Sequence, residues 1–392
     1  MKSEQKLNVL FLPAWYPNRT DSMIGLFVQR HAKSVSKFVN LSVLAVISDE
    51  NAKVVYEVET NSTQGFTEII IYIKKHKSGF GLLNTLVNGY RYISAHIAGW
   101  RILEQTGNKP QINHVHILTR AGVMALFFKI RYKIPFIITE HWSRYLPHNN
   151  AYKGSLRKKL TEKVLKASKG ISTVSTALKK GMNDTGLSKN RWEIIPNVID
   201  TSMFQLEKKE NAEHIIRISH ISCFEEQSKN MSGILRAVKR LKEQGRVFEL
   251  IMIGNGPDWE QTKQYAKELA LGTSIRFTDV LEGKKLVDEM SRCQFSVLFS
   301  NYETFAIVIP ENLSMGIPVI ATNVGGVPEV LPLEFGKLIP PKDENALSQA
   351  MDYMLDHFHE YHSESMRNYV EENYSYDEVG LRFHDFYKEA LS

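Results

Sequence analysis

The sequence predicts an α/β fold made of two doubly wound, Rossmann-like domains that face each other across a cleft. Short, continuously apolar runs alternate with longer amphipathic stretches, which is typical of parallel strands joined by helices. The same alternation starts afresh after Pro196. A length of 392 residues also fits two domains that each bury a core of their own.

In the N-terminal half, the chain opens with a strand, a loop and a helix. The run 7–12 is short and apolar and ends at Pro13, as a buried strand does. A loop rich in turn residues then leads into the helical pattern of 26–38. Further strands are expected at 41–47, 69–73, 115–118, 136–138 and 170–174, and a long amphipathic helix at 82–104.

The C-terminal half repeats this pattern and closes with two helices. The expected strands are 215–221, 248–253, 274–278, 295–299 and 318–321, and the expected helices are 344–357 and 375–391. The last helix has aromatic residues at helical spacing, Phe383, Phe386 and Tyr387. We therefore place the domain boundaries at 1–196 and 197–374, followed by a closing segment, 375–392.

Composition narrows the class and the compartment. A content of 43% hydrophobic and 23% charged residues is typical of a globular protein. The only cysteines, Cys223 and Cys293, form no CxxC or zinc-ligand spacing, which indicates a reducing compartment. Neither a signal-type apolar segment nor an uncharged run of about 18 apolar residues is present. We therefore expect a cytoplasmic protein.

Charge is distributed unevenly between the halves. Up to Pro196 there are 29 Lys and Arg against 12 Asp and Glu, a net charge of +17; after it there are 20 against 31, a net charge of −11. A basic half suits an anionic membrane surface or a phosphorylated acceptor. Nucleic acid is not expected as a partner, because no recognition motif is found. The basic cluster Lys153, Arg157, Lys158, Lys159, Lys163, Lys166 and Lys169 is either a solvated helix face or a peripheral membrane contact.

The window 301–329 carries the most specific pattern. Glu303 follows the expected strand 295–299, and ligands of open α/β sheets bind at the carboxyl ends of strands. A helix expected to start near Thr304 would direct free N–H groups at a diphosphate, and Glu311 would share a face with Glu303. Two glutamates alone are usually solvated surface residues. The G-x-P-V-I-A run and the Gly-Gly turn that follow point to a site instead.

This window resembles the signature of glycosyltransferase family 4, the retaining GT-B enzymes also called glycosyl transferases group 1. In that signature, two glutamates separated by seven residues precede such a strand and turn. I-G-N-G-P at 253–257 resembles the loop of the family near the nucleotide, and 195–200 resembles its interdomain linker. W-Y-P at 15–17 and G-L-F-V-Q at 25–29 are similar to its N-terminal loop and helix. The resemblance spans nearly the whole chain.

The resemblance implies roles for individual residues. It assigns donor binding to Gly25, Gly254, Gly256, Thr304, Phe305, Ala306, Ile307 and Glu311 and catalysis to His141, Glu303 and Lys229. Lys229 would bind phosphate, Glu303 would orient donor hydroxyls and Glu311 the ribose. His141, after the expected strand 136–138, would position the donor sugar or assist transfer, although a lone histidine is usually structural.

The chain departs from the family pattern at two places. The arginine that often precedes the phosphate-binding lysine is missing, because 221–226 contains no cation. Ala306 stands where the family commonly has glycine, which places a methyl group near the donor. No Asp-x-Asp pair is present, so we expect no essential metal and no other cofactor. A dinucleotide-type third glycine is replaced by Trp259, which disfavours hydride transfer.

The expected function is retaining transfer of a sugar from a nucleotide diphosphate donor to a glycan or lipid-linked acceptor, in surface polysaccharide or envelope glycan biosynthesis. The acceptor would bind on the side of 1–196 and the donor on 197–374, and the last helix would cross back to the first domain. Two alternatives stay open: a nucleotide-sugar epimerase or hydrolase on the same scaffold, and a non-catalytic sugar-nucleotide-binding module. The enzyme would be cytoplasmic, with a possible peripheral contact at the inner face of the membrane.

Overall fold

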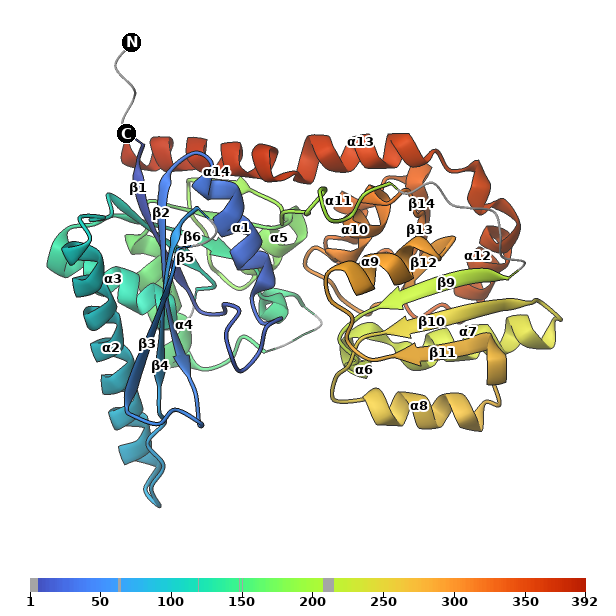
Figure 1. Ribbon diagram of the computed structural model, residues 1–392, viewed down its shortest axis with the longest axis horizontal. Helices are drawn as coiled ribbons and strands as arrows, with labels where there is room; N and C mark the ends of the chain where they lie inside the picture. The colour runs from blue at the N-terminus through green and yellow to red at the C-terminus, as the bar shows by residue number, and fades with distance from the viewer. Residues whose placement is uncertain (1–5, 63–64, 119, 148, 150, 207–214) are drawn as a thin grey trace, which may run out of the picture.

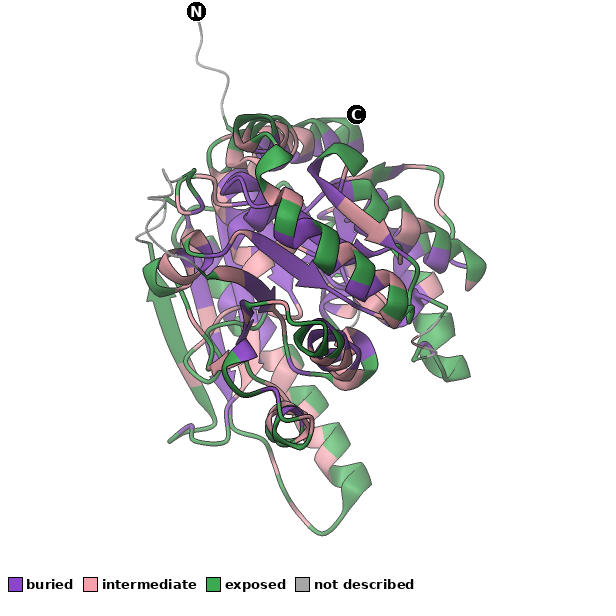
Figure 2. Ribbon diagram, turned by 90° about the vertical axis from the view of Figure 1, so that its right-hand side faces the viewer, coloured by how far each residue is buried: buried purple, intermediate pink, exposed green. Residues whose placement is uncertain are grey.

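Two α/β domains lie side by side in the computed structural model, which describes residues 6–62, 65–118, 120–147, 149, 151–206 and 215–392 (Figure 1). Each domain has one sheet between helices. Buried residues concentrate on the central strands, and exposed residues on the outer faces of the helices (Figure 2). The predicted fold of two doubly wound domains is confirmed.

The N-terminal domain is built on an eight-stranded sheet with the order β3-β4-β2-β1-β5-β6-β7-β8. Only the edge pair β3 and β4 is antiparallel. Leu10 and Leu12 of β1 enter the core on one face of the sheet, and Val9 and Phe11 the core on the other, so the continuous apolar run covers both. The elements are β1 (Asn8–Pro13), α1 (Leu26–Ser36), β2 (Asn40–Ser48), β3 (Tyr56–Asn61), β4 (Thr67–Ile73), α2 (Gly81–Gln105), β5 (Ile112–His116), α3 (Arg120–Tyr132), β6 (Phe136–Glu140), α4 (Ser155–Ala167), β7 (Gly170–Thr173), α5 (Thr176–Asp184) and β8 (Trp192–Ile194).

The C-terminal domain has a parallel six-stranded sheet with the order β11-β10-β9-β12-β13-β14. Its helix α12 starts at a side-chain cap, because Asp343 accepts a hydrogen bond from the amide of Ala346 at 2.9 Å. The elements are β9 (Ile216–Ile221), α6 (Glu226–Lys229), α7 (Met231–Glu243), β10 (Phe248–Ile253), α8 (Trp259–Glu268), β11 (Ile275–Thr278), α9 (Lys284–Ser291), β12 (Phe295–Leu298), α10 (Val308–Ser314), β13 (Val319–Thr322), α11 (Val327–Val330), β14 (Gly336–Ile339) and α12 (Glu344–His357).

The last two helices, α13 (Ser363–Tyr374) and α14 (Tyr376–Leu391), extend across both domains (Figure 1). Ser375 separates them and caps α14, since its side chain accepts a hydrogen bond from Glu378 N. α14 packs on α1 of the N-terminal domain, where Ser34 Oγ donates to the carbonyl of Tyr376 at 2.5 Å. The aromatic side chains of α14 are buried in the same core as α1.

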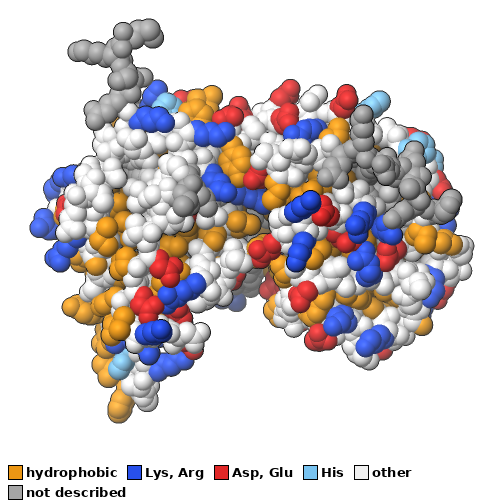
Figure 3. All heavy atoms as spheres, viewed as in Figure 1, with side chains coloured by type: hydrophobic (Ala, Val, Ile, Leu, Met, Phe, Trp, Pro, Cys, Tyr) orange, Lys and Arg blue, Asp and Glu red, His pale blue; other side chains and the backbone are white. Residues whose placement is uncertain are grey.

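A second contact between the domains lies at the N-terminus of α5. The carboxylate of Glu329 in α11 accepts hydrogen bonds from the amides of Thr176 and Ala177 at 2.7 and 2.8 Å. Figure 3 shows the surface hollowed between the two domains. The carboxyl ends of both sets of strands meet near this junction (Figure 1).

Some elements differ from the sequence-based expectation. The predicted strand 115–118 is wrong at both ends, because β5 covers Ile112–His116 and Ile117 adopts a left-handed φ of 72°. Polar residues at the start of β5 obscured its extent. His114 is nevertheless buried there, with hydrogen bonds from its ring to Tyr387 and Thr139. The edge strand β3 and the short strands β8 and β14 were not expected.

Candidate active site

The candidate donor site begins where β12 ends. The carboxylate of Glu303 pairs with the ammonium group of Lys229 and accepts a hydrogen bond from Ser300 Oγ at 2.8 Å. Burial lowers the pKa of Lys229, but the charge and hydrogen bond of Glu303, together with the nearby Cys223 and Tyr302, outweigh this effect, so the pKa lies above its ordinary value. Two of the three predicted catalytic residues are therefore in direct contact.

The Gly-Gly turn packs directly against the backbone of Glu303. Gly325 has a φ of 51°, and a Cβ at this position would lie 1.8 Å from the carbonyl oxygen of Glu303. Only glycine fits such an approach. The amide of Gly326 donates to the same carbonyl at 3.2 Å. The turn thus fixes the backbone that carries the candidate catalytic carboxylate.

The segment 304–307 is a turn rather than the start of a helix. α10 begins at Val308, so the expectation of a helix start near Thr304 is wrong, and Glu303 does not share a helix face with Glu311. Within the described part of the chain, no acceptor takes the amide hydrogens of residues 304–307. Four unpaired donors in succession are suited to an anionic ligand.

Phe305 and Ala306 hold this turn in place. The Phe305 ring is buried and packs edge-on against Tyr374, with 5.6 Å between ring centroids. Ala306 has a φ of 56°, in the left-handed region that favours glycine. An alanine there costs about 1–2 kcal/mol of strain. The backbone is therefore strained at Ala306, where the chain departs from the family pattern.

Glu311, the predicted ribose ligand, is paired across the domain junction. Its Oε1 accepts a hydrogen bond from Arg30 Nη1 of α1 at 2.6 Å, and both residues are buried. Burial raises the pKa of Glu311, and the charge of Arg30 only partly offsets this. Oε2 of Glu311 makes no hydrogen bond to any described residue.

The other predicted glycines lie where two backbone segments meet. A Cβ on Gly254 would lie 2.0 Å from the carbonyl oxygen of Ser222, and one on Gly256 would lie 2.6 Å from the amide nitrogen of Phe224. Gly25 approaches the carbonyl of Trp15, with a Cβ distance of 2.4 Å. These glycines therefore shape the loops at the carboxyl edges of the two sheets.

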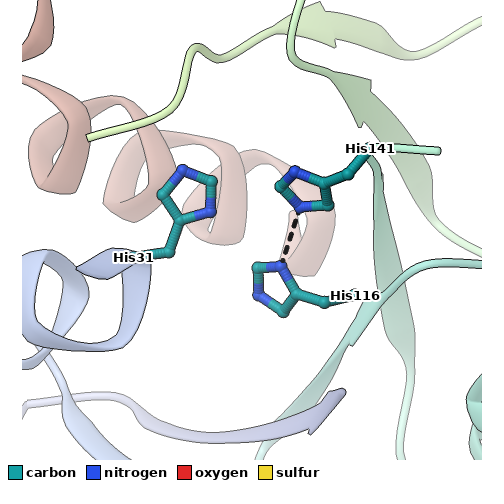
Figure 4. Close-up of side chains that lie close together, drawn as sticks. All are labelled: His31, His116 and His141. Atoms are coloured by element: carbon teal, nitrogen blue, oxygen red, sulfur yellow. Dashed lines mark hydrogen bonds between the residues drawn. The ribbon is translucent and has the colours of Figure 1, made fainter. Parts of the chain in front are cut away.

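His141 directly follows β6 and belongs to a cluster of three buried histidines (Figure 4). His116 comes from the end of β5 and His31 from α1. The His116 Nδ1 and His141 Nε2 atoms are 3.3 Å apart and share a hydrogen bond. One ring nitrogen from each histidine lies within 4.8 Å of the others, an arrangement that could hold a metal ion.

Burial keeps these three rings neutral. It lowers the pKa of His31 to about 4, and burial together with the neighbouring imidazoles places the pKa values of His116 and His141 well below the ordinary value. His31 Nε2 lies 3.1 Å from the carbonyl oxygen of Pro196, so the neutral ring carries its proton there and leaves a lone pair on Nδ1. Nδ1 of His31, Nε2 of His116 and Nδ1 of His141 make no hydrogen bond to described residues.

Sequence reasoning found only one member of this cluster. His116 lies within the predicted strand 115–118, which was a usable signal, whereas His31 lies within a helix and gave none. Glu140, left without a role by the sequence, is structural: its buried carboxylate accepts hydrogen bonds from the amides of Leu118, His141 and Trp142 at 2.9 to 3.0 Å. It fixes the loop that carries His141.

Comparisons with known proteins agree with this architecture. The family model described as Glycosyltransferase Family 4 matches residues 59–203, and the model described as Glycosyl transferases group 1 matches residues 198–374. The chain is 25% identical over 207 residues to the phosphatidylinositol N-acetylglucosaminyltransferase gpi3 subunit of Schizosaccharomyces pombe, covering 53% of this chain and 45% of that protein. The chain spans about half the length of the first curated relatives it matches.

Solved structures share the fold over nearly their whole length. Sucrose-phosphate synthase from Thermosynechococcus elongatus is 17% identical with a TM-score of 0.76, covering 97% of this chain and 98% of that one. The Anabaena protein HepE in complex with UDP is 14% identical with a TM-score of 0.73, covering 97% and 100%. The two family matches together extend from residue 59 to residue 374, and the chain belongs to glycosyltransferase family 4, the glycosyl transferases group 1.

Proposed function

We propose that the chain is a retaining glycosyltransferase that moves a sugar from a nucleotide diphosphate donor to a glycan or lipid-linked acceptor. The main support for this proposal is the contact of Lys229 with Glu303. It lies beside the turn 304–307, whose amide hydrogens have no acceptor among the described residues. A departing nucleotide diphosphate carries negative charge, and a cation with preorganised amides is what stabilises it.

In the proposed reaction, the bond between the anomeric carbon and the phosphate oxygen breaks as the acceptor oxygen attacks from the same face. The acceptor hydroxyl gives its proton to the departing phosphate oxygen, so configuration is retained. Lys229 donates to the phosphate, and Glu303 orients donor hydroxyls. His141 contributes a neutral imidazole, held by His116, that positions the sugar.

The ribose site is compatible with the ion pair of Glu311. Arg30 occupies Oε1, while Oε2 makes no hydrogen bond to described residues and is free to accept from a ribose hydroxyl. We propose that Arg30 orients the carboxylate for this purpose. The loop glycines Gly25, Gly254 and Gly256 complete the proposed donor site.

We further propose that no metal ion is essential and that no other cofactor is needed, because the lysine and the amides supply the charge that a metal supplies elsewhere. The similarity to HepE, which is described in complex with UDP, makes uridine nucleotides the first donors to test. The gpi3 relative is named for transfer to phosphatidylinositol, which favours a lipid-linked acceptor. Envelope or surface glycan synthesis at the cytoplasmic face of a membrane accommodates these features.

One observation favours a second candidate, a sugar-nucleotide-binding module without turnover. The segment 221–226 lacks the cation that usually assists Lys229, and the exposed Cys223 lies in this segment. Weaker leaving-group stabilisation lowers the rate of transfer more than donor binding. Such a module would bind donor without consuming it, whereas an epimerase or hydrolase would consume donor without acceptor.

Donor consumption distinguishes these functions. The purified chain is incubated with a panel of nucleotide sugars, with lipid-linked and free-sugar acceptors, and with or without a chelator. We expect acceptor-dependent, chelator-resistant release of one nucleotide diphosphate, abolished by Glu303→Ala and unchanged by Glu268→Ala on α8. Release without acceptor would support hydrolysis or epimerisation, and binding without release for every donor would support the silent module.

A further inference from the structure

A cavity of about 620 Å³ opens at the carboxyl edge of the N-terminal sheet. Its walls come from the loop after β1, the end of β2, the start of α3, the loop after β6, and α4. Trp15 and Trp142 meet there edge-on, with 5.1 Å between ring centroids. Arg120, Arg144 and Arg157 also line it, and none of its described lining residues is acidic. The cavity is therefore apolar and aromatic with an excess of positive charge.

Arg144 is a buried cation that forms no ion pair with any described residue. Arg144 is only 3% exposed, and its guanidinium lies 4.4 Å from the centre of the Trp142 ring. Nη2 donates to Tyr145 Oη at 2.7 Å, while Nε donates to none of the residues that the structure describes. The buried carboxylate of Glu140 is occupied by three backbone amides. A buried charge is normally paired, so this arrangement calls for an anionic ligand.

An apolar stripe on α2 leads away from this cavity. Leu82, Leu86, Tyr90 and Ile93 follow one another at helical spacing and are 76%, 62%, 71% and 43% exposed. In the second half of α2 the same face is covered by α3, where Trp100 packs on Phe128 and Tyr132. The first half projects beyond the rest of the domain (Figure 1), and hydrophobic side chains gather on the surface at this end (Figure 3).

The charged residues next to this stripe in the sequence are all basic, although Lys77 pairs with Glu50 of the loop after β2 at 2.9 Å. Residues 69–103 contain no aspartate or glutamate, and Lys74, Lys75 and Lys77 precede α2. Tyr92 of α2 lines the cavity, as do Leu156 and Leu160 of α4, which are 80% and 41% exposed. The apolar stripe, the cavity and the basic residues are therefore joined. An exposed apolar helix face flanked by lysines matches the surface of an anionic membrane.

We propose that this cavity binds the acceptor and that the acceptor is a lipid phosphate whose attached sugar supplies the attacking hydroxyl. Its phosphate contacts Arg144, Arg120 and Arg157, and its apolar chain runs over α4 and α2 into the membrane leaflet on which the stripe of α2 rests. This inference rests on the proposed transferase function, because it names the acceptor class of that reaction. The aromatic pair Trp15 and Trp142 would pack against the first carbons of the chain.

Tryptophan fluorescence tests the ligand chemistry, because two of the five tryptophans line the cavity. The full chain is titrated with farnesyl phosphate, with farnesol and with inorganic phosphate. We expect a saturable change with farnesyl phosphate at concentrations at least about ten-fold lower than with either other probe, because a charge-assisted contact and apolar burial act together. Arg144→Gln weakens this binding at least about ten-fold. Arg157→Gln, at an exposed position that tolerates substitution, weakens it less, and Arg292→Gln in the other domain leaves it unchanged.

Several results would overturn the proposal. Equal binding of farnesol would mean a purely apolar pocket, and equal binding of inorganic phosphate would mean a site for a free anion. Unchanged binding by both Arg144→Gln and Arg157→Gln would remove the arginines from the site. Calorimetric titration with UDP, GDP and ADP runs in parallel. If a nucleotide binds and farnesyl phosphate does not, only the proposed acceptor site is overturned. If no nucleotide binds, the proposed function is overturned.

Vesicle flotation tests the stripe on α2. We expect the chain to float with vesicles of phosphatidylcholine and phosphatidylglycerol and to stay in solution with phosphatidylcholine alone. The double variant Leu82→Asn, Leu86→Asn loses this association, while Val247→Asn, at an equally exposed apolar position of the C-terminal domain, keeps it. Flotation of the double variant to the same extent as the parent chain would exclude the stripe as the membrane contact.

Discussion

Arg30 of α1 and Glu311 of α10 form a buried ion pair that joins the two domains, with 2.6 Å between Nη1 and Oε1. The residue after Arg30 is His31, whose ring meets the carbonyl of Pro196 at the interdomain linker. α1 therefore contacts the C-terminal domain, the linker and, through α14, the end of the chain. The predicted ribose ligand is thus also a structural link between the domains.

Truncation of Arg30 tests this link. Arg30→Ala leaves the carboxylate of Glu311 buried without a counter-charge, and we expect a loss of about 3–5 kcal/mol in the free energy of unfolding. Urea unfolding followed by circular dichroism measures it. The double variant Arg30→Met, Glu311→Leu should recover most of the loss, because it removes both charges and keeps the volume. A single variant as stable as the parent chain would show that the pair contributes little.

Acid stability follows from the buried histidines. Burial lowers the pKa values of His31, His96 and His220 to about 4 in the folded chain, against about 6.5 when unfolded. As pH falls through this interval, the unfolded chain takes up protons that the folded chain does not, so the free energy of unfolding decreases by about 3 kcal/mol for each histidine. The contribution is complete above about pH 6.5 and is lost as pH falls through about pH 4.

Urea midpoints measured from about pH 7.5 down to about pH 5 check this dependence. We expect a steep fall in the midpoint for the parent chain and a shallower fall for His96→Gln, which lies on α2 outside the candidate site. Gln264→Ala, at an exposed position of α8 that carries no titratable group, should keep the parent slope. A midpoint that does not change with pH would mean that these rings titrate normally.

Replacement of Ala306 by glycine should stabilise the chain. The φ of 56° costs an alanine about 1–2 kcal/mol, part of which glycine gives back through its larger unfolded-state entropy. We expect a net gain of about 0.5–1 kcal/mol, seen as a higher melting temperature. Ala237→Gly, in the middle of α7, should instead lower it. Destabilisation by Ala306→Gly would show that the methyl group packs more favourably than the backbone is strained.

Substitution of Gly325 tests whether the close contact of this glycine with the backbone of Glu303 is needed for activity. Gly325→Ala places a methyl group on the carbonyl of Glu303, so the turn and the carboxylate must move, and we expect donor turnover to fall more than about 100-fold. Gly186→Ala is the matched control, since its φ is also positive, at 85°, but its Cβ would meet nothing. Turnover is measured as nucleotide diphosphate release. Equal effects of the two variants would mean that backbone strain alone is responsible.

The sequence predicted most of the fold because its strands are buried on both faces and therefore apolar throughout. β10 and α12 match the expected bounds, 248–253 and 344–357. The edge strand β3 was not predicted, because exposed strands carry polar residues and lack a continuous apolar run. The start of α10 was also misplaced, since a left-handed Ala306 cannot be read from an alanine.

Contacts between segments that are distant in the sequence are the features of the candidate site that could not be predicted. Lys229 and Glu303 were named from their motifs, but their mutual pairing depends on how β9 and β12 adjoin. The partner of Glu311 lies in the other domain, and no local pattern singles out Arg30. The incomplete hydrogen bonding of the Arg144 guanidinium among the described residues likewise could not be predicted, because it depends on the burial of this side chain.

In the proposed function, Lys229 and the turn 304–307 bind the diphosphate of the donor. Calorimetric titration of UDP, GDP and ADP into the parent chain, Lys229→Met and the exposed control Lys239→Met tests it most directly. We expect one nucleotide to bind the parent and the control alike and to bind Lys229→Met at least about ten-fold more weakly, because a charge-assisted contact to phosphate is lost. Equal affinity of Lys229→Met and the parent chain for that nucleotide would exclude Lys229 from the diphosphate site.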